Sequence, residues 1–211
     1  MKLIGMLDSP YVRRVAISLQ LLGLSFEHEP LSVFQTFEAF QQINPVVKAP
    51  SLICDDGLVL MDSTLILQYA AAIAPDRSLL PTDPNALKRS LQMIGLALTA
   101  CEKSIQIVYE RQLRPAEKFH QPWISRVTGQ LHAAYDGLER SLQAQPLSFA
   151  REGITQASIT TAVAWYFTQQ VVPEVINAEN YPGLQAASDV AETLAEFKAA
   201  PYGDGVVQFL V

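Results

Sequence analysis

The stretch MLDSPYVRRVAISLQLLGL, residues 6–24, decides the fold of the first part of the chain. It overlaps the apolar run KLIGML at residues 2–7, which is typical of a buried strand. From Pro10 onward, apolar residues recur at three- and four-residue steps, which indicates a helix. Ser9 and Pro10 are typical of an N-cap and a first helical residue, and Gly23 is typical of the position after the last turn. A strand therefore turns abruptly into an amphipathic helix, with a hydroxyl group at the junction.

The next fifty residues continue an alternating pattern of strands and helices. SFEHEPL at residues 25–31 predicts a second strand, and FEAFQQINP at 37–45 predicts a short helix that ends at its Asn-Pro pair. Two short apolar runs, APSLIC and LVLM, are separated by the sequence Asp-Asp-Gly, which is a strong hairpin signal. A further helix is predicted over residues 63–73. The order β-α-β-α-β-β-α predicts a parallel βαβ unit whose sheet is extended by an antiparallel hairpin.

The second part of the chain is predicted to be helical throughout. The segment APDRSLLPTDPNA, residues 74–86, contains three prolines and is typical of a linker. Helices are predicted after it at about 85–114, 121–144, 155–170 and 184–200. We therefore predict an α/β domain over residues 1–76, a linker at 77–84 and an all-helical domain over 85–211.

Composition and charge exclude several classes of protein. Hydrophobic residues make up 49% of the chain and charged residues 17%, which is typical of ordered globular proteins. The net charge of −6 is spread evenly, and because the chain has no basic run we do not expect it to bind nucleic acid. The uncharged segment at residues 153–173 carries too many threonines and glutamines to span a membrane.

Cysteines and histidines give no sign of a cross-link or a metal site. Cys54 and Cys101 lie in apolar surroundings and share no CxxC spacing, which indicates buried, reduced thiols. The three histidines lack ligand spacing, so no metal is expected. The N-terminal apolar run is too short for a signal peptide. We therefore expect a soluble, cytoplasmic protein.

Three motifs of the first part resemble the glutathione-binding domain of glutathione S-transferases. They are SPYVR at residues 9–13, INPVVKAP at 43–50 and LMDSTLILQYAA at 60–71. GITQASITTAVAW at 153–165 resembles the helical domain of the same family, so the resemblance covers nearly the whole chain. The serine after the first strand is most similar to the serine-type bacterial members. The resemblance implies a thioredoxin-like βαβαββα domain followed by an all-helical domain, assembled as a homodimer.

The resemblance gives Ser9 a second role besides capping. Taken alone, a serine followed by Pro10 is most simply an N-cap. In the family the equivalent hydroxyl donates a hydrogen bond to the sulfur of glutathione, which stabilises the thiolate and lowers the pKa of the thiol. A helix N-terminus favours the same negative charge. The resemblance therefore implies that Ser9 is the catalytic residue as well as the cap.

The resemblance also implies that five other residues bind glutathione. The family has a cis peptide bond before the proline equivalent to Pro50, which turns the backbone N–H and C=O of Ala49 toward the cysteinyl backbone of glutathione. Lys48 is implied in binding the glycine carboxylate, with a solvated lysine as the alternative. Asp62 and Ser63 match the acid and serine that bind the ammonium and the α-carboxylate of the γ-glutamyl end. From its residue type alone, Ser63 is predicted to be the N-cap of the helix at 63–73.

The helical domain is expected to supply most of the pocket for the second substrate. The candidates are aromatic or cationic side chains: Tyr11 from the first domain, and Tyr109, Arg114, Phe119 and Trp165. For each of them, a place in a helix core or in a surface salt bridge is an alternative. The late helix of the family begins with Ser/Thr-x-x-Asp, whereas this chain has Thr155 and Ser158, which predicts a capping box without a charge.

Together these features predict a glutathione transferase of the detoxification type, with glutathione as co-substrate and no metal, nucleic-acid or membrane partner. It would stabilise the glutathione thiolate and add it to a small electrophile, with peroxide reduction or isomerisation as alternatives at the same site. The rival of a different class is a non-catalytic interaction protein with this fold, such as the stringent starvation proteins that bind RNA polymerase. A maleyl-type isomerase is a further alternative, although such relatives carry Ser-Ser-Cys where this chain has Asp8-Ser9-Pro10.

Overall fold

The chain forms two compact units, seen in a computed structural model that describes residues 1–75 and 77–208. The first unit comprises Met1–Leu79 together with the chain from Glu192 onward, and the second comprises Leu80–Ala191. A four-stranded sheet with helices forms the first unit, and the second is helical. The predicted fold class, a thioredoxin-like domain followed by a helical region, is confirmed.

The sheet of the first unit has the strand order β2-β1-β3-β4. Its strands are short: β1 (Lys2–Ile4), β2 (Glu27–Glu29), β3 (Ser51–Ile53) and β4 (Val59–Leu60). β1 runs parallel to β2 and antiparallel to β3, so that Leu3 pairs with His28 on one side and with Leu52 on the other. The parallel pair requires a crossover connection, which the helix between them supplies. The predicted hairpin joins β3 to β4, and Gly57 in its turn has a φ of +87°, a conformation that favours glycine.

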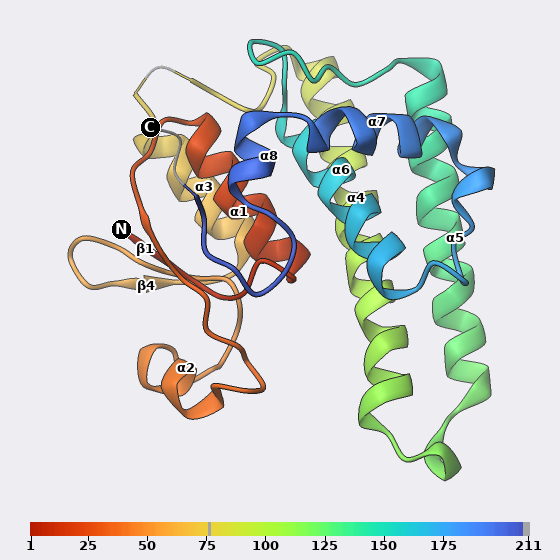
Figure 1. Ribbon diagram of the computed structural model, residues 1–211. Coiled ribbons are helices and arrows are strands. Elements are labelled where there is room, and N and C mark those ends of the chain that lie inside the picture. The colour runs from red at the N-terminus through yellow and green to blue at the C-terminus, as the bar shows by residue number, and fades with distance from the viewer. Residues whose placement is uncertain (76, 209–211) are drawn as a thin grey trace. The chain divides into compact units, whose positions relative to one another are not determined.

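Three helices of the first unit surround the sheet. α1 (Pro10–Leu21) and α3 (Ser63–Ile73) pack side by side on one face, and α2 (Phe37–Ile43) lies on the other side (Figure 1). α3 has the predicted bounds. α1 is more deeply buried than an amphipathic helix requires, because even Arg13 and Arg14 are each only 2% exposed. Charges buried to this degree need partners in the protein.

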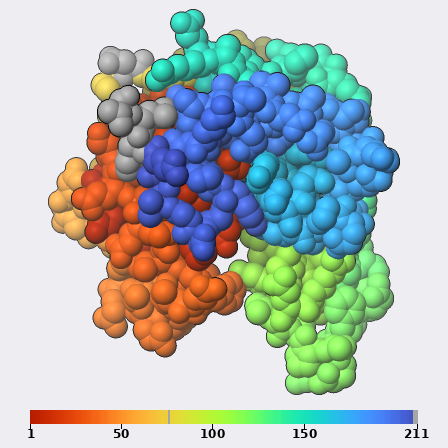
Figure 2. Space-filling view, viewed as in Figure 1, coloured from red at the N-terminus to blue at the C-terminus, as the bar shows by residue number. Residues whose placement is uncertain are grey.

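Arg13 finds its partners in the C-terminal segment. Its two terminal nitrogens donate to the two carboxylate oxygens of Glu192 at 2.8 and 2.7 Å, and its Nε donates to the carbonyl of Ala200 at 2.8 Å. The guanidinium also lies 5.7 Å from the ring centroid of the buried Phe197 in α8 (Ala195–Ala199). Figure 2 shows this segment, in dark blue, lying against the red N-terminal residues of the first unit.

The return of the chain to the first unit differs from the predicted domain division, which assigned residues 85–211 to the helical domain. From Glu192 onward the chain groups with the first unit, because the buried Arg13 binds it there. The predicted boundary at residue 76 and the last three residues of the predicted helical domain lie outside the described residues.

His28 connects the same C-terminal segment to the sheet. Its Nδ1 accepts a hydrogen bond from the backbone N–H of Val207 at 3.1 Å, and its Nε2 lies 2.8 Å from the carbonyl of Gly5. Both contacts are satisfied only by the neutral ring with its proton on Nε2. Burial lowers the pKa of His28 below its usual value, against the opposite effect of the Gly5 carbonyl.

The second unit is built on three long helices. α4 packs against both α5 and α6 (Figure 1). The helical elements of this unit are α4 (Pro84–Leu113), η1 (Ala116–Lys118), α5 (Gln121–Ala144), α6 (Gln156–Val171), η2 (Ala178–Asn180) and α7 (Pro182–Glu192). The helices predicted at 85–114, 121–144 and 155–170 are confirmed within two residues. The helix predicted at 184–200 is wrong, because the chain leaves helical geometry after Glu192 and forms α7 and α8 instead.

The N-terminus of α6 contains the predicted capping box. Oγ1 of Thr155 accepts from the backbone N–H of Ser158, and Oγ of Ser158 accepts from the backbone N–H of Thr155, both at 3.3 Å. A neutral serine therefore replaces the acid of the family pattern without loss of either bond. Within the described ranges, none of the helices is both long and apolar enough to cross a lipid bilayer.

We expect that Arg13→Met lowers the free energy of unfolding by about 3 kcal/mol, because it leaves the Glu192 carboxylate without its buried partner. Lys2→Met is the matched control, since Lys2 faces Glu27 and Glu29 at 3.5 Å on the surface, where such pairs contribute at most about 1 kcal/mol. Urea denaturation of the two variants measures the difference. Equal losses would mean that the Arg13 pair contributes no more than a surface pair.

The stability of the protein should also depend on His28 between its usual pKa of about 6.5 and its lowered pKa in the folded chain. In that window the unfolded chain binds the proton and the folded chain does not. Stability is therefore complete above about pH 6.5 and falls as the pH is lowered, by at most about 1.4 kcal/mol per pH unit. Urea denaturation from pH 5 to 8 should give a smaller fall for His28→Gln than for the wild type. Parallel curves would contradict this role.

Candidate functional site

Ser9 lies at the N-terminal end of α1 as its N-cap. Its Oγ accepts a hydrogen bond from the backbone N–H of Val12 at 3.4 Å, and Pro10 occupies the first turn. The side chain is half-buried. Across the described parts of the chain, no group accepts the proton of this hydroxyl. A hydroxyl oxygen can accept one bond while its hydrogen donates another, so capping leaves Ser9 able to donate to a ligand.

The electrostatic surroundings of Ser9 contain one acid from its own loop. Asp8 directly precedes it, and loss of solvent around the Asp8 carboxyl raises its pKa, with the carboxylate of Asp204 adding to the effect. The first turn of α1 itself contains no acidic residue. The positive end of the α1 dipole therefore favours an anion at the Ser9 end of the helix.

Gly5 brings the start of α1 and the segment around Ala49 together. Its φ is +134°, and a Cβ placed on it would lie 2.6 Å from Cγ2 of Val12 and 3.2 Å from Cβ of Ala49. Only glycine allows backbone segments to approach this closely. The predicted contact of Ala49 with a ligand at Ser9 is thus compatible with the geometry of the first unit.

The segment between α2 and β3 has the backbone that the resemblance implied. The Ala49–Pro50 peptide bond is cis, Ala49 is half-buried and Pro50 is buried. Lys48 is exposed at its edge. Val47 has a φ of +52°, which is rare for a β-branched residue and occurs where the surrounding contacts impose it.

At the start of α3, the predicted N-cap was wrong by one residue. Asp62 is the cap, because its Oδ1 accepts from the backbone N–H groups of Thr64 and Leu65 at 3.0 and 3.3 Å. Ser63 is instead the first helical residue and is 3% exposed. The residue types allow either position, and the extended backbone of Asp62 decides between them.

Arg14 is a residue of this site that sequence reasoning missed. Its Nη1 donates to Oγ of Ser63 at 3.2 Å and lies 3.4 Å from Oγ1 of Thr64. The guanidinium therefore places a positive charge behind the N-terminus of α3. Arginine is usually exposed, so its residue type gave no signal. The available signal was its position within the otherwise apolar run from Val12 to Leu19.

The predicted residues of the second-substrate pocket have mixed surroundings. In the first unit, Tyr11 is half-buried; in the second, Tyr109 and Phe119 are 43% and 37% exposed. Arg114 forms a salt bridge with the buried Glu110 at 2.8 Å. Trp165 is 1% exposed, donates to Gln185 and packs edge-on against Tyr135.

For Arg114 and Trp165 the structure therefore favours the alternatives that the sequence left open, a salt bridge and a helix core. A buried indole whose N–H is already paired contributes packing to the core of its unit.

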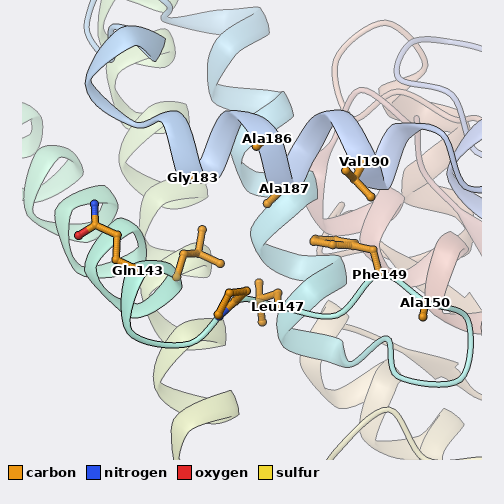
Figure 3. Close-up of a pocket in the computed structure, with 10 residues that line it drawn as sticks. Gln143, Leu147, Phe149, Ala150, Gly183, Ala186, Ala187 and Val190 are labelled. Atoms are coloured by element: carbon orange, nitrogen blue, oxygen red, sulfur yellow. The ribbon is translucent and has the colours of Figure 1, made fainter.

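The second unit has an apolar cavity of about 570 Å³ that contains none of these candidates. It lies between the end of α5, the segment that follows it and α7 (Figure 3). Phe149 and Val190 point toward one another across it. In α7 the lining residues Gly183, Ala186, Ala187 and Val190 recur at helical spacing, so they form one face of small side chains.

Two further kinds of candidate group are the cysteines and the side chains that can bind a metal. Cys54 and Cys101 are both buried thiols, as predicted. In the part of the chain that the structure describes, no three His, Cys, Asp or Glu side chains gather as metal ligands would.

Comparisons with known proteins agree with the motifs. Residues 3–78 match the family described as glutathione S-transferase, N-terminal domain. An uncharacterized GST-like protein of Escherichia coli K12, YibF, is 28% identical over 82% of this chain and 85% of its own length. Maleylacetoacetate isomerase of Rattus norvegicus is 26% identical over 80% of this chain and 73% of its own length.

Solved structures extend this similarity to the whole chain. A glutathione S-transferase of Methylobacterium radiotolerans, solved in complex with glutathione sulfonate, is 25% identical and superposes with a TM-score of 0.86. The superposition covers 100% of this chain and 99% of that one.

Because Val47 has a left-handed backbone conformation and its neighbour Val46 does not, glycine should affect stability differently at the two positions. Val46→Gly should lower the free energy of unfolding by about 1 kcal/mol through the entropy of glycine. Val47→Gly should leave it equal or higher, because glycine removes the cost of about 1–2 kcal/mol for a side chain at positive φ. Urea denaturation should therefore separate the two variants by about 1–2 kcal/mol. Equal destabilisation would contradict the strained conformation of Val47.

Proposed function

Because the chain belongs to the glutathione S-transferase family, we propose that it binds glutathione at the N-terminal end of α1 and adds the glutathione thiolate to a small electrophile. The observation that carries this proposal is the hydroxyl of Ser9, which caps α1 by accepting a hydrogen bond through its oxygen. Its proton can then be donated to a ligand. A thiol has a pKa near 8.5 in water. Lowering it by two pH units requires about 2.7 kcal/mol of preferential stabilisation of the thiolate.

Two features of α1 supply this stabilisation in our proposal. Ser9 donates a hydrogen bond to the sulfur, and such bonds are stronger to an ion than to a neutral acceptor. The N-terminus of α1 adds the positive end of the helix dipole. Serine cannot form a mixed disulfide with glutathione, which favours transfer of the thiolate over thiol exchange.

We assign the rest of glutathione to the segments that converge on Ser9. The N–H and C=O of Ala49 would pair with the cysteinyl backbone, next to the cis bond before Pro50. Lys48 would face the glycine carboxylate. At the other end, the free carboxylate oxygen of Asp62 would face the ammonium of the γ-glutamyl group, and Ser63 would donate to its α-carboxylate.

Arg14 strengthens the γ-glutamyl end of this assignment. Its donation to Oγ of Ser63 occupies a lone pair of that oxygen and leaves the hydroxyl proton to be donated. The guanidinium also adds positive charge behind a helix N-terminus that already favours anions. The carboxylate of glutathione would then neutralise a charge that the first unit buries.

The remaining assignments concern the electrophile and the assembly. We propose that the second unit provides the electrophile pocket, with Tyr109 and Phe119 as its candidate lining residues. We further propose a cytoplasmic homodimer with a role in detoxification. Exposed apolar side chains at the start of β4, just before it and on α3 support a contact between copies: Leu58, Val59, Leu65 and Ile73.

An isomerase acting on a maleyl-type diketo acid is the second candidate function, because of the similarity to the rat maleylacetoacetate isomerase. It would use the same glutathione site. This chain has Asp8-Ser9-Pro10 where we expect Ser-Ser-Cys in a maleyl-type isomerase. We therefore favour conjugation.

The test is a pH titration of the thiolate absorbance of glutathione bound to the protein. For the wild type we expect a pKa about two units below that of free glutathione, and Ser9→Ala should return it to nearly the free value. Ser9→Thr keeps both the hydroxyl and the cap, so it should retain the lowered pKa. Loss of the cap in Ser9→Ala costs about 1 kcal/mol of stability, which urea denaturation measures separately.

Three results would contradict the proposal in different ways. A folded wild type that does not bind glutathione would exclude the enzyme and favour a non-catalytic interaction protein. An unchanged thiolate pKa in Ser9→Ala would exclude Ser9 as the donor. Turnover of maleylacetoacetate without conjugation of halogenated aromatic acceptors would favour the isomerase.

A further inference from the structure

The segment from Asn44 to Ser51 carries the Ala49 peptide that the proposed function assigns to glutathione. It connects α2 to β3 and has no regular secondary structure of its own. Such a segment can present a backbone N–H to a ligand only if other groups fix its conformation. The residues at its two ends, Asn44 and Ser51, are 5% and 0% exposed.

These two side chains form a chain of hydrogen bonds with one direction. Nδ2 of Asn44 donates to Oγ of Ser51 at 2.8 Å, and Oγ of Ser51 donates to the carbonyl of Lys48 at 2.8 Å. The serine oxygen accepts from the amide, so its single proton is free to bind the carbonyl. Because Nδ2 of Asn44 can only donate, the direction of both bonds is fixed.

The other polar groups of Asn44 are bound as well. Its Oδ1 accepts from the backbone N–H of Val46 at 3.0 Å, and its carbonyl accepts from that of Val47 at 2.8 Å. Nδ2 also lies 3.3 Å from Sδ of Met61. Asn44 therefore fixes the first half of the segment directly, and the positive φ of Val47 is held by these contacts.

The carbonyl of Lys48 determines the direction of the Ala49 N–H, because both belong to one planar peptide. The Lys48–Ala49 bond is trans, so the carbonyl and the N–H point to opposite sides. Since Ser51 binds the carbonyl, the N–H of Ala49 points away from Ser51. The orientation of this donor is thus set by two buried side chains that do not reach the ligand themselves.

We infer that Asn44 and Ser51 are positioning residues for glutathione, which orient the N–H of Ala49 before the ligand arrives. This inference rests on the proposed function, since it concerns the same site. Fixing a loop in its bound conformation raises affinity by reducing the entropy lost on binding. The two residues should therefore affect glutathione binding but not the chemistry at Ser9.

The test compares Ser51→Ala and Asn44→Asp with the wild type. Ser51→Ala removes the donor to Lys48. Asn44→Asp keeps the size of the side chain and the acceptor for Val46, but it turns the donor into an acceptor, so that Ser51 donates to it instead of to Lys48. In both variants we expect the dissociation constant of glutathione, measured by calorimetry, to rise about tenfold.

A positioning role affects glutathione binding alone. We therefore expect the turnover number at saturating glutathione and the pKa of the bound thiol to stay at their wild-type values in both variants. The matched control is Ser32→Ala, which removes another buried serine of the first unit that accepts from two backbone N–H groups. It should lower stability while leaving the affinity for glutathione unchanged.

Amide hydrogen exchange gives a readout that requires no ligand. Exchange at Ala49 in the free protein should become faster in Ser51→Ala and in Asn44→Asp, and should stay unchanged in Ser32→Ala. Unchanged affinity in both variants, with a wild type that binds glutathione, would overturn this inference and leave the proposed function intact. A wild type that does not bind glutathione would overturn both.

Discussion

The position of the proposed glutathione site depends on two adjacent buried arginines of α1. Arg13 binds Glu192 and the carbonyl of Ala200, and Arg14 binds the hydroxyls at the start of α3. The two side chains leave the helix in different directions, so α1 is held by the C-terminal segment on one side and by α3 on the other. A buried guanidinium is expensive to leave without partners, which makes each of these arrangements specific. Ser9 is placed by the same helix, four residues before Arg13.

The elements that the sequence predicted are those determined by local patterns. The bounds of α3 and α5 follow from the spacing of apolar residues, and the hairpin follows from its Asp-Gly turn. The three motifs correctly placed Ser9 at a helix start and implied the cis bond between Ala49 and Pro50. In each case the structure of the segment is determined by residues that are close to it in the sequence.

The differences arise where distant residues decide the outcome. Nothing near Glu192 shows that Arg13 binds it, so the return of the chain to the first unit was not predictable from local patterns. Which of Asp62 and Ser63 caps α3 depends on the backbone angles of Asp62. The burial of Trp165 depends on Tyr135 and Gln185, which come from other helices. A pattern gives the face of a helix that is buried, but it does not give the partner.

The N-termini of α1 and α7 are satisfied in different ways. α7 has a charged partner from another helix, because the buried carboxylate of Glu139 accepts from the N–H groups of Gly183 and Leu184, both at 2.9 Å. A Cβ on Gly183 would lie 2.7 Å from that carboxylate, so this contact requires glycine. The anion that the helix dipole favours is thus already part of the protein.

α1 lacks such an internal anion in its first turn and is capped by the neutral Ser9. Its dipole therefore favours a negative charge that comes from outside the chain. The glutathione thiolate that we propose at this position would supply that charge only while the ligand is bound. The neutral cap at α1 and the carboxylate at α7 follow the same physical rule, and only the neutral cap is compatible with a proposed anionic ligand at its helix.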